Sequence, residues 1–555
     1  AENPIDKAIE KFEVHPSILK IKEKVHLASA CEFTFHQVQL DDVGHEINQL
    51  NEKKADTVGT IPCKPLKQSS EAFVDILLNL INSSIENGEF PDELKLADVT
   101  PTFKKGDATS VENYRPVSVL PSVSKIYERL IQKQILQYMN RCLSPFLCGY
   151  RKGYNSQYAL ISLVEKWKKT LDQHGYAGAM LMDLSKAFDT LNHELLIAKL
   201  HAYGFSRHAL KLLHSYLTNR WQRTKINNSF STWTELILGV PQGSVLGPIL
   251  FNIYINDLFW FNEITDVCNF ADDTTFYACD MELENVLLRL EHDSLLAIEW
   301  FESNYMKLNA DKCHLLISGF KYQNHWARIG DSKIWESSEE RLLGVTIDNS
   351  LKFNIHVNNI CKKASRKLSA LGRISKLLPL YKRKLLFNTF IKSQFAYCPL
   401  VWMFHDRGIN NRINRIHERA LRMIYNDDVS TFEELLEKDE GFTIHEINLQ
   451  TLAIELFKVK KGKGVEIMNN LFTERNFDGP TLRTQSEFVV PSAKTVNKGE
   501  CSLRHLGPLI WNIVPKHLKD ISTLGAFKEQ IREWKPMGCP CRLCKLYVEG
   551  LGYIN

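Results

Sequence analysis

The 555-residue sequence has no long apolar run, no internal repeat and few cysteines. No apolar run reaches the ~18 residues that span a bilayer, so we expect no membrane segment. The 13 Cys are mostly single and lie among apolar neighbours. We also expect no signal peptide, and therefore reduced thiols in an intracellular protein. An apolar content of 44% and a charged content of 24% exclude a disordered, collagenous or fibrous chain.

The net charge of +4 is small but unevenly distributed. Residues 361–426 hold 15 Lys and Arg against 2 Asp and Glu, which is a local charge of +13, so the other residues sum to −9. Such asymmetry indicates a polyanionic partner such as nucleic acid. A solvated helical face is the alternative explanation for the same segment.

Strand and helix patterns alternate along the chain, which predicts an α+β or mixed architecture. Apolar residues at helical spacing predict helices over 71–87 and 122–139. Strands are expected on both sides of a polar turn near residue 108, over 176–184, and on both sides of Asp272 and Asp273. From residue 352 to 425 the pattern is basic and helical.

Three aspartates are the sharpest candidates for chemistry. Asp183 ends an apolar strand, and Asp272 and Asp273 form an acidic turn between two strands. Adjacent acids raise each other's pKa unless a cation compensates, and oxygen ligands suit Mg²⁺. Ions held there would keep an attacking hydroxyl and a leaving pyrophosphate in line. The alternative is an ordinary surface turn, and sequence separation alone leaves the convergence of the three open.

Six segments occur in an order that identifies a family. They are DVTPTFKKGDATSVENYRPVSVL, GYRKGYNSQYAL, MLMDLSKAFDT, GVPQGSVLGP, FADDTTFYA and WFESNYMKLNADKCHLLISG. In that order they resemble two fingers motifs and palm motifs A to D of the reverse transcriptase of non-LTR (LINE-type) retrotransposons, particularly the Jockey-like group. The resemblance covers about residues 51–555.

The resemblance implies an α+β right-hand polymerase with fingers, palm and thumb and a mostly helical C-terminal extension. We expect a linker region over 1–50, fingers and palm over 51–345, a basic helical thumb over 346–430, and a C-terminal region over 431–555 that ends in a Cys-rich tail. The implied activity is RNA-directed DNA synthesis in target-primed retrotransposition. In it, two-metal phosphoryl transfer extends a DNA 3′ end with dNTPs.

The resemblance also implies roles for individual residues near the aspartates. Asp183 and Asp272 would be the main ligands of two Mg²⁺ ions, for which Mn²⁺ can substitute, and Asp273 would assist. Phe188 would lie under the nucleotide sugar and exclude a 2′-OH by steric clash; a core aromatic is the alternative. The other implied nucleotide contacts are Lys104 (or Lys105), Arg115, Gln242 and Gly243. Lys312, or alternatively Lys307, would protonate the leaving pyrophosphate, with a surface salt bridge as the ordinary alternative.

Template contacts are expected from Arg151 and from the thumb. Arg412, Arg415, Arg419 and Arg422 are spaced by three and four residues and therefore share one helical face. Contacts of this kind to a nucleic-acid backbone are insensitive to sequence and sensitive to salt.

The C-terminal tail holds Cys539, Cys541 and Cys544. Three thiolates at this spacing could ligate Zn²⁺ with a fourth ligand from Cys501 or His505. The spacing is not that of a standard zinc knuckle, and free thiols are the alternative.

The implied partners are an RNA template, a DNA primer or target DNA, and dNTPs. Family members carry an apurinic-type endonuclease upstream, and we expect none in this chain before the first fingers motif. Use of chromosomal DNA implies a nuclear location, although we identify no import signal. Two alternatives stay open. One is a catalytically inactive, transposon-derived nucleic-acid-binding protein. The other is an RNA-templated RNA polymerase, against which Phe188 and the FADD motif argue.

Overall fold

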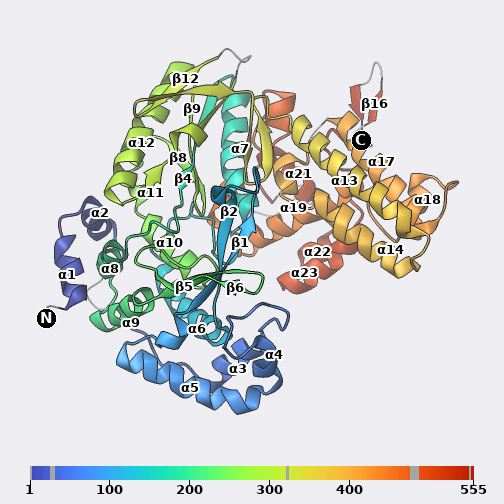
Figure 1. Ribbon diagram of the computed structural model, residues 1–555. Coiled ribbons are helices and arrows are strands. Elements are labelled where there is room, and N and C mark those ends of the chain that lie inside the picture. The colour runs from blue at the N-terminus through green and yellow to red at the C-terminus, as the bar shows by residue number, and fades with distance from the viewer. Residues whose placement is uncertain are drawn as a thin grey trace.

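A central six-stranded sheet organises the molecule (Figure 1). The computed structural model describes residues 3–25, 32–319, 324–404, 406–475, 487–544, 546–548 and 552–554. The strand order is β12-β13-β11-β3-β9-β8, and only the β11–β13 pair is parallel. The strands are β3 (Tyr176–Met182), β8 (Asp266–Phe270), β9 (Asp273–Asp280), β11 (His314–Ser318), β12 (Trp326–Ile329) and β13 (Ser332–Ser337). The alternation of strands and helices predicted from the sequence is confirmed as a mixed α/β architecture.

Both faces of the central sheet are buried. Successive side chains of a strand point to opposite faces, so one strand contributes residues to both. Met180 and Phe276 face the core that includes α12 (Leu283–Ser303). Ala179 and Tyr277, their neighbours in sequence, face the core that includes α7 (Ser156–Asp172). The sheet therefore separates two apolar clusters, to which β3 contributes apolar residues on both faces.

A second sheet is formed around the hairpin that the sequence predicts. β1 (Ala97–Phe103) pairs antiparallel with β2 (Tyr114–Val119) and parallel with β5 (Trp221–Ile226). Short strands β6 (Ser229–Phe230) and β7 (Thr234–Glu235) pair with β5. We call this group the hairpin sheet.

The predicted helices are confirmed beside the hairpin sheet. α5 (Ser70–Asn87) ends at Gly88, whose φ of 66° is the left-handed conformation that glycine adopts at helix ends. α6 (Ser122–Met139) has the predicted bounds. Other elements of the chain up to residue 348 include α4 (Cys63–Gln68), α8 (His193–Ala202), α9 (Arg207–Leu217), α10 (Gly247–Ile255), α11 (Leu258–Phe261), β4 (Leu184–Ser185), β10 (Lys307–Leu308), β14 (Glu339–Leu342) and β15 (Val345–Asp348).

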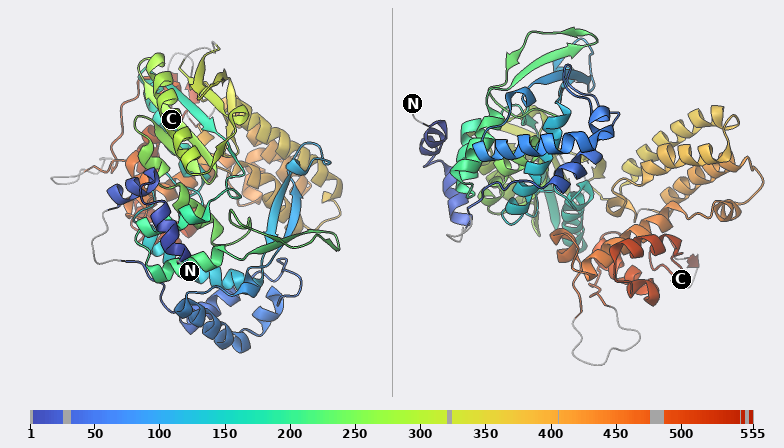
Figure 2. Two further views of the ribbon diagram at one scale, coloured as in Figure 1. Left: turned by 60° about the vertical axis from the view of Figure 1, so that its left-hand side comes forward. Right: turned by 90° about the horizontal axis from the view of Figure 1, so that it is seen from below.

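The expected linker region over 1–50 is instead largely packed structure. Residues 3–25 and 32–50 contain α1 (Pro4–Lys11), α2 (Pro16–Lys24) and α3 (Leu40–Asn48). α1 and α2 contact α8, and α3 contacts α5 and α6; in Figure 2 the N-terminal helices lie beside the body. Ile5, Ile21 and Ile47 are buried. The apolar residues of these short helices therefore belong to the core that includes α12. The average composition of the segment is polar and does not indicate this burial.

A group of basic helices follows the sheets. α13 (Asn354–Ser375), α14 (Leu380–Phe387) and α17 (Arg407–Tyr425) pack together, joined by η4 (Asn388–Lys392), α15 (Ser393–Phe395) and α16 (Pro399–Trp402). Figure 1 shows them to the right of the central sheet. The chain then forms α18 (Phe432–Lys438), α19 (Ile444–Lys460), α20 (Glu466–Leu471), α21 (Leu503–Ile513), α22 (Lys516–Lys519), α23 (Leu524–Gln530), β16 (Leu546–Val548) and β17 (Gly552–Ile554).

Helix α7 joins the C-terminal helices to the central sheet. The Tyr158 hydroxyl donates to Glu455 Oε2 over 2.7 Å. The Asp172 carboxylate accepts from the backbone N–H of Thr495 over 2.7 Å. These buried contacts and a shared apolar cluster make α7, the basic helices and the C-terminal helices one packed unit. Among the described residues, no helix combines the length and apolar character needed to cross a bilayer.

Candidate active site

The structure brings the three predicted aspartates together at one edge of the central sheet. β3 and β9 are antiparallel, with Met182 opposite Thr274. Asp183 follows β3 and Asp273 opens β9, so these two lie next to each other just beyond that pair. Asp272 stands in the tight β8–β9 turn. Convergence of the acids, which the sequence left open, follows from this register.

The acidic turn is held by residues that the sequence analysis missed. Ala271 has a left-handed φ of 60°, and the Asn269 side chain donates to its carbonyl over 3.0 Å and to Thr274 Oγ1 over 2.9 Å. Gly149 lies against the turn, and a Cβ there would be 2.5 Å from the Ala271 nitrogen. Only glycine allows this approach. The glycine at position 149, in the GYRKG motif, is the sequence feature that could have indicated this close approach.

Electrostatics show that the acids and the hairpin sheet face each other. Loss of hydration and then the charges of Asp272 and Asp183 raise the pKa of Asp273 to about 6. The charges of Lys104 and Arg115 act in the opposite direction. The positive charges of Lys104 and Arg115, at the end of the hairpin sheet, therefore act on the Asp273 carboxylate. Three carboxylates that repel one another supply the hard oxygen donors that Mg²⁺ prefers, so the residues present fit this ion.

Two lysines were alternatives as the proton donor, and the structure separates them. Lys312 Nζ lies 3.5 Å from Asp183 Oδ2, and its side chain is 65% exposed. Lys307 lies in β10, in register with Ser185 of β4. Lys312 is thus the lysine whose ammonium contacts a site carboxylate.

An aromatic pair lies beside the carboxylates. Phe188 is half-buried and stacks on Phe251, with ring centroids 4.3 Å apart. The Tyr150 ring meets Phe188 edge-on at 6.2 Å. Burial and the Asp272 charge raise the pKa of Tyr150, whereas Arg115 lowers it. Tyr150, with a φ of 55°, was also missed in the sequence, although it stands in the GYRKG motif.

The Gln242–Gly243 loop lies between β2 and the turn that carries Asp189. The Gln242 side chain donates to Asp189 Oδ1 over 2.8 Å, and the Gln242 backbone carbonyl accepts from the Ser118 N–H over 2.8 Å. Gly243 has a φ of 136°, and a Cβ there would be 2.3 Å from the Ser118 carbonyl oxygen. Gly243 therefore permits the loop to lie on β2. Asp189, which orients Gln242, was not singled out from the sequence.

The remaining predicted contacts differ in their surroundings. Lys104, Lys105 and Arg115 are exposed on the hairpin sheet. The Arg151 guanidinium instead donates to the Ser144 carbonyl over 2.6 Å and to Asn140 Oδ1 over 3.2 Å. These bonds fasten the loop that carries Arg151, and sequence spacing could not reveal them.

The four arginines of α17 lie on one side of that helix. Arg412, Arg415 and Arg419 are exposed. Arg422 is half-buried and pairs with Glu418 over 2.7 Å. The opposite side, which includes Ile413, Ile416 and Ala420, is buried. Three of the four predicted cations are therefore available to a ligand.

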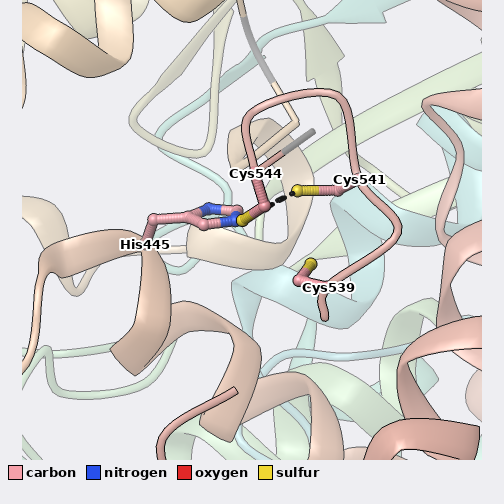
Figure 3. A group of neighbouring side chains, drawn as sticks. All are labelled: His445, Cys539, Cys541 and Cys544. Atoms are coloured by element: carbon pink, nitrogen blue, oxygen red, sulfur yellow. Dashed lines mark hydrogen bonds between the residues drawn. The ribbon is translucent and has the colours of Figure 1, made fainter. Parts of the chain in front are cut away.

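The C-terminal cysteines cluster with an unexpected partner. Cys539, Cys541 and Cys544 surround His445 of α19 (Figure 3). The fourth ligand predicted from the sequence, Cys501 or His505, was wrong for the geometry observed. His505 Nδ1 lies 2.9 Å from the Pro491 carbonyl, and neither residue belongs to the cluster. His445 is distant in sequence, so spacing offered no signal for it.

Comparison with known proteins finds a matching family model and several relatives. Residues 103–347 match the family model described as reverse transcriptase (RNA-dependent DNA polymerase). The RNA-directed DNA polymerase from mobile element jockey of Drosophila melanogaster is 25% identical over 403 residues, which cover 70% of this chain and 44% of that protein. The probable RNA-directed DNA polymerase from transposon BS of the same species is 24% identical over 404 residues, again 70% and 44%. The chain thus spans less than half the length of these relatives.

A further relative matches a shorter part of the chain. The retrovirus-related Pol polyprotein from type-2 retrotransposable element R2DM of Drosophila melanogaster is 27% identical over 263 residues, or 44% of this chain and 24% of that protein. Residues 103–347, which match the family model, contain all strands of the central sheet and the three aspartates.

Proposed function

We propose that residues 103–347 form a reverse transcriptase domain of the LINE type and that this chain is an RNA-directed DNA polymerase of a non-LTR retrotransposon. The observation that carries the proposal is the convergence of Asp183, Asp272 and Asp273 at one sheet edge, opposite Lys104 and Arg115. In this proposal the central sheet is the palm, the hairpin sheet belongs to the fingers, and the basic helices are the thumb.

The carboxylates would hold the reaction's metal ions, with Asp183 and Asp272 as the main ligands and Asp273 assisting. When bound, two Mg²⁺ ions, or Mn²⁺ in their place, would supply positive charge for the attacking 3′ hydroxyl and the leaving pyrophosphate. Burial, and then the charges of Asp272 and Asp183, raise the pKa of Asp273, which supports a cation at this place.

The surrounding side chains bind and select the nucleotide. Lys104 and Arg115 bind triphosphate oxygens, with Lys105 as the alternative lysine, since Arg offers a bidentate fork and Lys a point charge. Phe188, braced by Phe251, closes the space that a 2′-OH would occupy. Lys312 donates a proton to the leaving pyrophosphate.

Two loops position the template and the nucleotide. Gln242 and Gly243 contact the templating base and the nucleotide, and Asp189 orients the Gln242 amide. Arg151 acts through its loop, which carries Tyr150 next to Phe188.

The thumb binds the RNA–DNA duplex through its backbone. Arg412, Arg415 and Arg419 present charge on the exposed side of α17, and phosphate contacts of this kind are independent of base sequence. The partners are thus an RNA template, a DNA primer and dNTPs. The relatives' mobile elements support a role in target-primed retrotransposition on chromosomal DNA, and hence a nuclear location.

Primer extension tests the proposal. The parent chain should incorporate dTTP on poly(rA)·oligo(dT) with Mg²⁺, whereas Asp272→Asn should not. Incorporation of UTP with the same efficiency as dTTP would instead identify an RNA polymerase.

The other candidate is a catalytically inactive nucleic-acid-binding protein. Salt-sensitive RNA binding by a well-folded parent, with no incorporation of dTTP or UTP in Mg²⁺ or Mn²⁺, would favour it. The intact set of three aspartates favours the polymerase.

A further inference from the structure

The cluster of His445, Cys539, Cys541 and Cys544 has the dimensions of a metal site. One ligand atom from each residue lies within 4.8 Å of every other. The Cys541 and Cys544 sulfurs are 3.6 Å apart, and His445 Nε2 lies 3.2 Å from Cys541 Sγ. With Zn–S bonds of about 2.3 Å, tetrahedral ligands are separated by roughly 3.8 Å. The two measured separations are slightly shorter than that value, and no pair of ligand atoms exceeds 4.8 Å.

The histidine in the cluster is buried without an adequate polar partner. His445 is 6% exposed, and its Nε2 faces the Cys541 sulfur, a weak hydrogen-bond partner. Its Nδ1 is buried and has no hydrogen-bond partner within the described residues. A buried imidazole is normally satisfied by a strong donor or acceptor, or by a metal ion.

The cysteines approach the histidine from residues 539–544, which follow α23. Cys539 and Cys541 are buried, whereas Cys544 is exposed and leaves the cluster open to an ion from solvent. The Gln450 side chain donates to the carbonyls of Arg532 and Trp534 over 3.2 and 2.9 Å. The chain is therefore attached to α19 just before the cysteines, and the cluster makes a second attachment.

We propose that His445, Cys539, Cys541 and Cys544 bind one structural Zn²⁺ ion that fastens the C-terminal tail to α19. Three thiolates and one imidazole form a closed tetrahedral ligand set, which leaves no position for substrate. This site is independent of the proposed magnesium site, because it lies in the C-terminal region and uses sulfur and nitrogen instead of oxygen ligands.

The position of α19 gives this attachment its structural effect. α19 packs against α16 and α17 of the basic helices and against α20, α21 and α23 of the C-terminal region. Through Glu455 it also bonds Tyr158 of α7. An ion bound at the start of α19 therefore fixes the C-terminal tail to a helix that contacts both the basic helices and α7.

Metal analysis of the full-length chain tests the proposal. After brief washing with EDTA to clear weak sites, the purified parent should retain roughly one zinc ion per chain. His445→Gln and Cys541→Ser should each lose most of this zinc. The matched controls are His505→Gln and Cys501→Ser, which remove the same side-chain types just outside the cluster and should retain it.

Measurements on the parent protein alone test the proposal even if a variant fails to fold. A mercurial that modifies thiols should release the bound zinc stoichiometrically, and Co²⁺ substitution should produce the visible absorption of a tetrahedral thiolate site. Trypsin should cleave the tail faster after zinc removal. Absence of zinc from the parent, a Cys541–Cys544 disulfide in reduced preparations, or zinc lost from His505→Gln but kept by His445→Gln would overturn the proposal.

Discussion

The two halves of the chain distribute charge in opposite ways. In the central sheet, three carboxylates converge on one edge, and burial together with the neighbouring charges of Asp272 and Asp183 raises the pKa of Asp273 to about 6. In α17, the arginines are spread along one helix side, and three of them are exposed. Concentrated charge at a sheet edge requires a small, dense counter-ion, whereas dispersed charge on a helix suits an extended polyanion. The first arrangement supports chemistry and the second supports binding.

The two proposed metal sites repeat this contrast. The aspartates offer oxygen atoms at an accessible edge, and Asp183 remains 41% exposed. The C-terminal cluster offers sulfur and nitrogen, and three of its four residues are buried. An open oxygen site admits substrate phosphates, whereas a closed sulfur site holds structure.

The largest expected effect separates chemistry from binding. Asp272→Asn should reduce single-nucleotide extension by about 10³-fold or more, because a ligand of the metal ions that stabilise the transition state is lost. Its affinity for an RNA–DNA duplex without nucleotide should stay within about twofold, since the thumb is untouched. Single-turnover extension and a duplex titration measure the two quantities. A parallel loss of binding would contradict the division between the halves.

A smaller effect is expected from the aromatic pair. Phe188→Val should lower the preference for dNTP over NTP by about 10- to 100-fold, because the ring no longer fills the space of the 2′-OH. Competing kcat/KM values for dTTP and UTP give the preference. Tyr150→Phe keeps the edge contact and should leave the preference unchanged. An unaltered preference in Phe188→Val would return Phe188 to an ordinary core role.

The basic helices should respond to acid through two buried histidines. Burial lowers the pKa of His356 in α13 and of His417 in α17 to about 4, and neighbouring cations add to the effect. The unfolded value is about 6.5, so the folded state binds fewer protons. Stability is therefore complete above pH 6.5 and falls as the pH decreases towards 4, by up to about 3 kcal/mol per histidine.

Urea unfolding followed by tryptophan fluorescence checks this prediction, since Trp402 lies 6.0 Å from the His356 ring. The parent should lose stability between pH 7 and pH 5, and His417→Gln should lose less over the same interval. Equal losses in both proteins would show that His417 does not contribute.

The smallest effect concerns salt. Arg415→Gln combined with Arg419→Gln should reduce the slope of log affinity against log salt by about 1.4 to 1.8, as expected for two lost phosphate contacts. Extension at saturating duplex should be unchanged. Arg422→Gln is the matched control, because Arg422 already pairs with Glu418 and should barely change the slope. An unchanged slope in the double variant would remove α17 from the binding surface.

Local pattern was sufficient for several elements of the fold. The helices over 71–87 and 122–139 and the strand, acidic turn and strand around Asp272 agree with the structure. Apolar periodicity and turn chemistry are encoded within a few residues, so they can be recognised without a fold. The packing of the N-terminal segment into the core was not expected, because its apolar residues are few and gain their burial from distant partners.

The residues of the candidate sites likewise fall into those that a local motif identifies and those that depend on a distant contact. Asp183, Asp272, Asp273 and Phe188 were identified by residue type within ordered motifs. Roles that depend on a distant contact were not: the Asp189 bond to Gln242, the Arg151 bonds to carbonyls, and the position of His445.

The sequence by itself therefore determined the chemical types of this protein: acids at strand ends, a basic helical segment and a Cys-rich tail. Only the tertiary structure decided which of them meet. Asp183 and Asp272 are 89 residues apart and converge through antiparallel pairing of β3 with β9. His445 and Cys541 are 96 residues apart and meet because the chain returns to α19. Pairing over such separations depends on the burial of whole elements, which no short pattern contains.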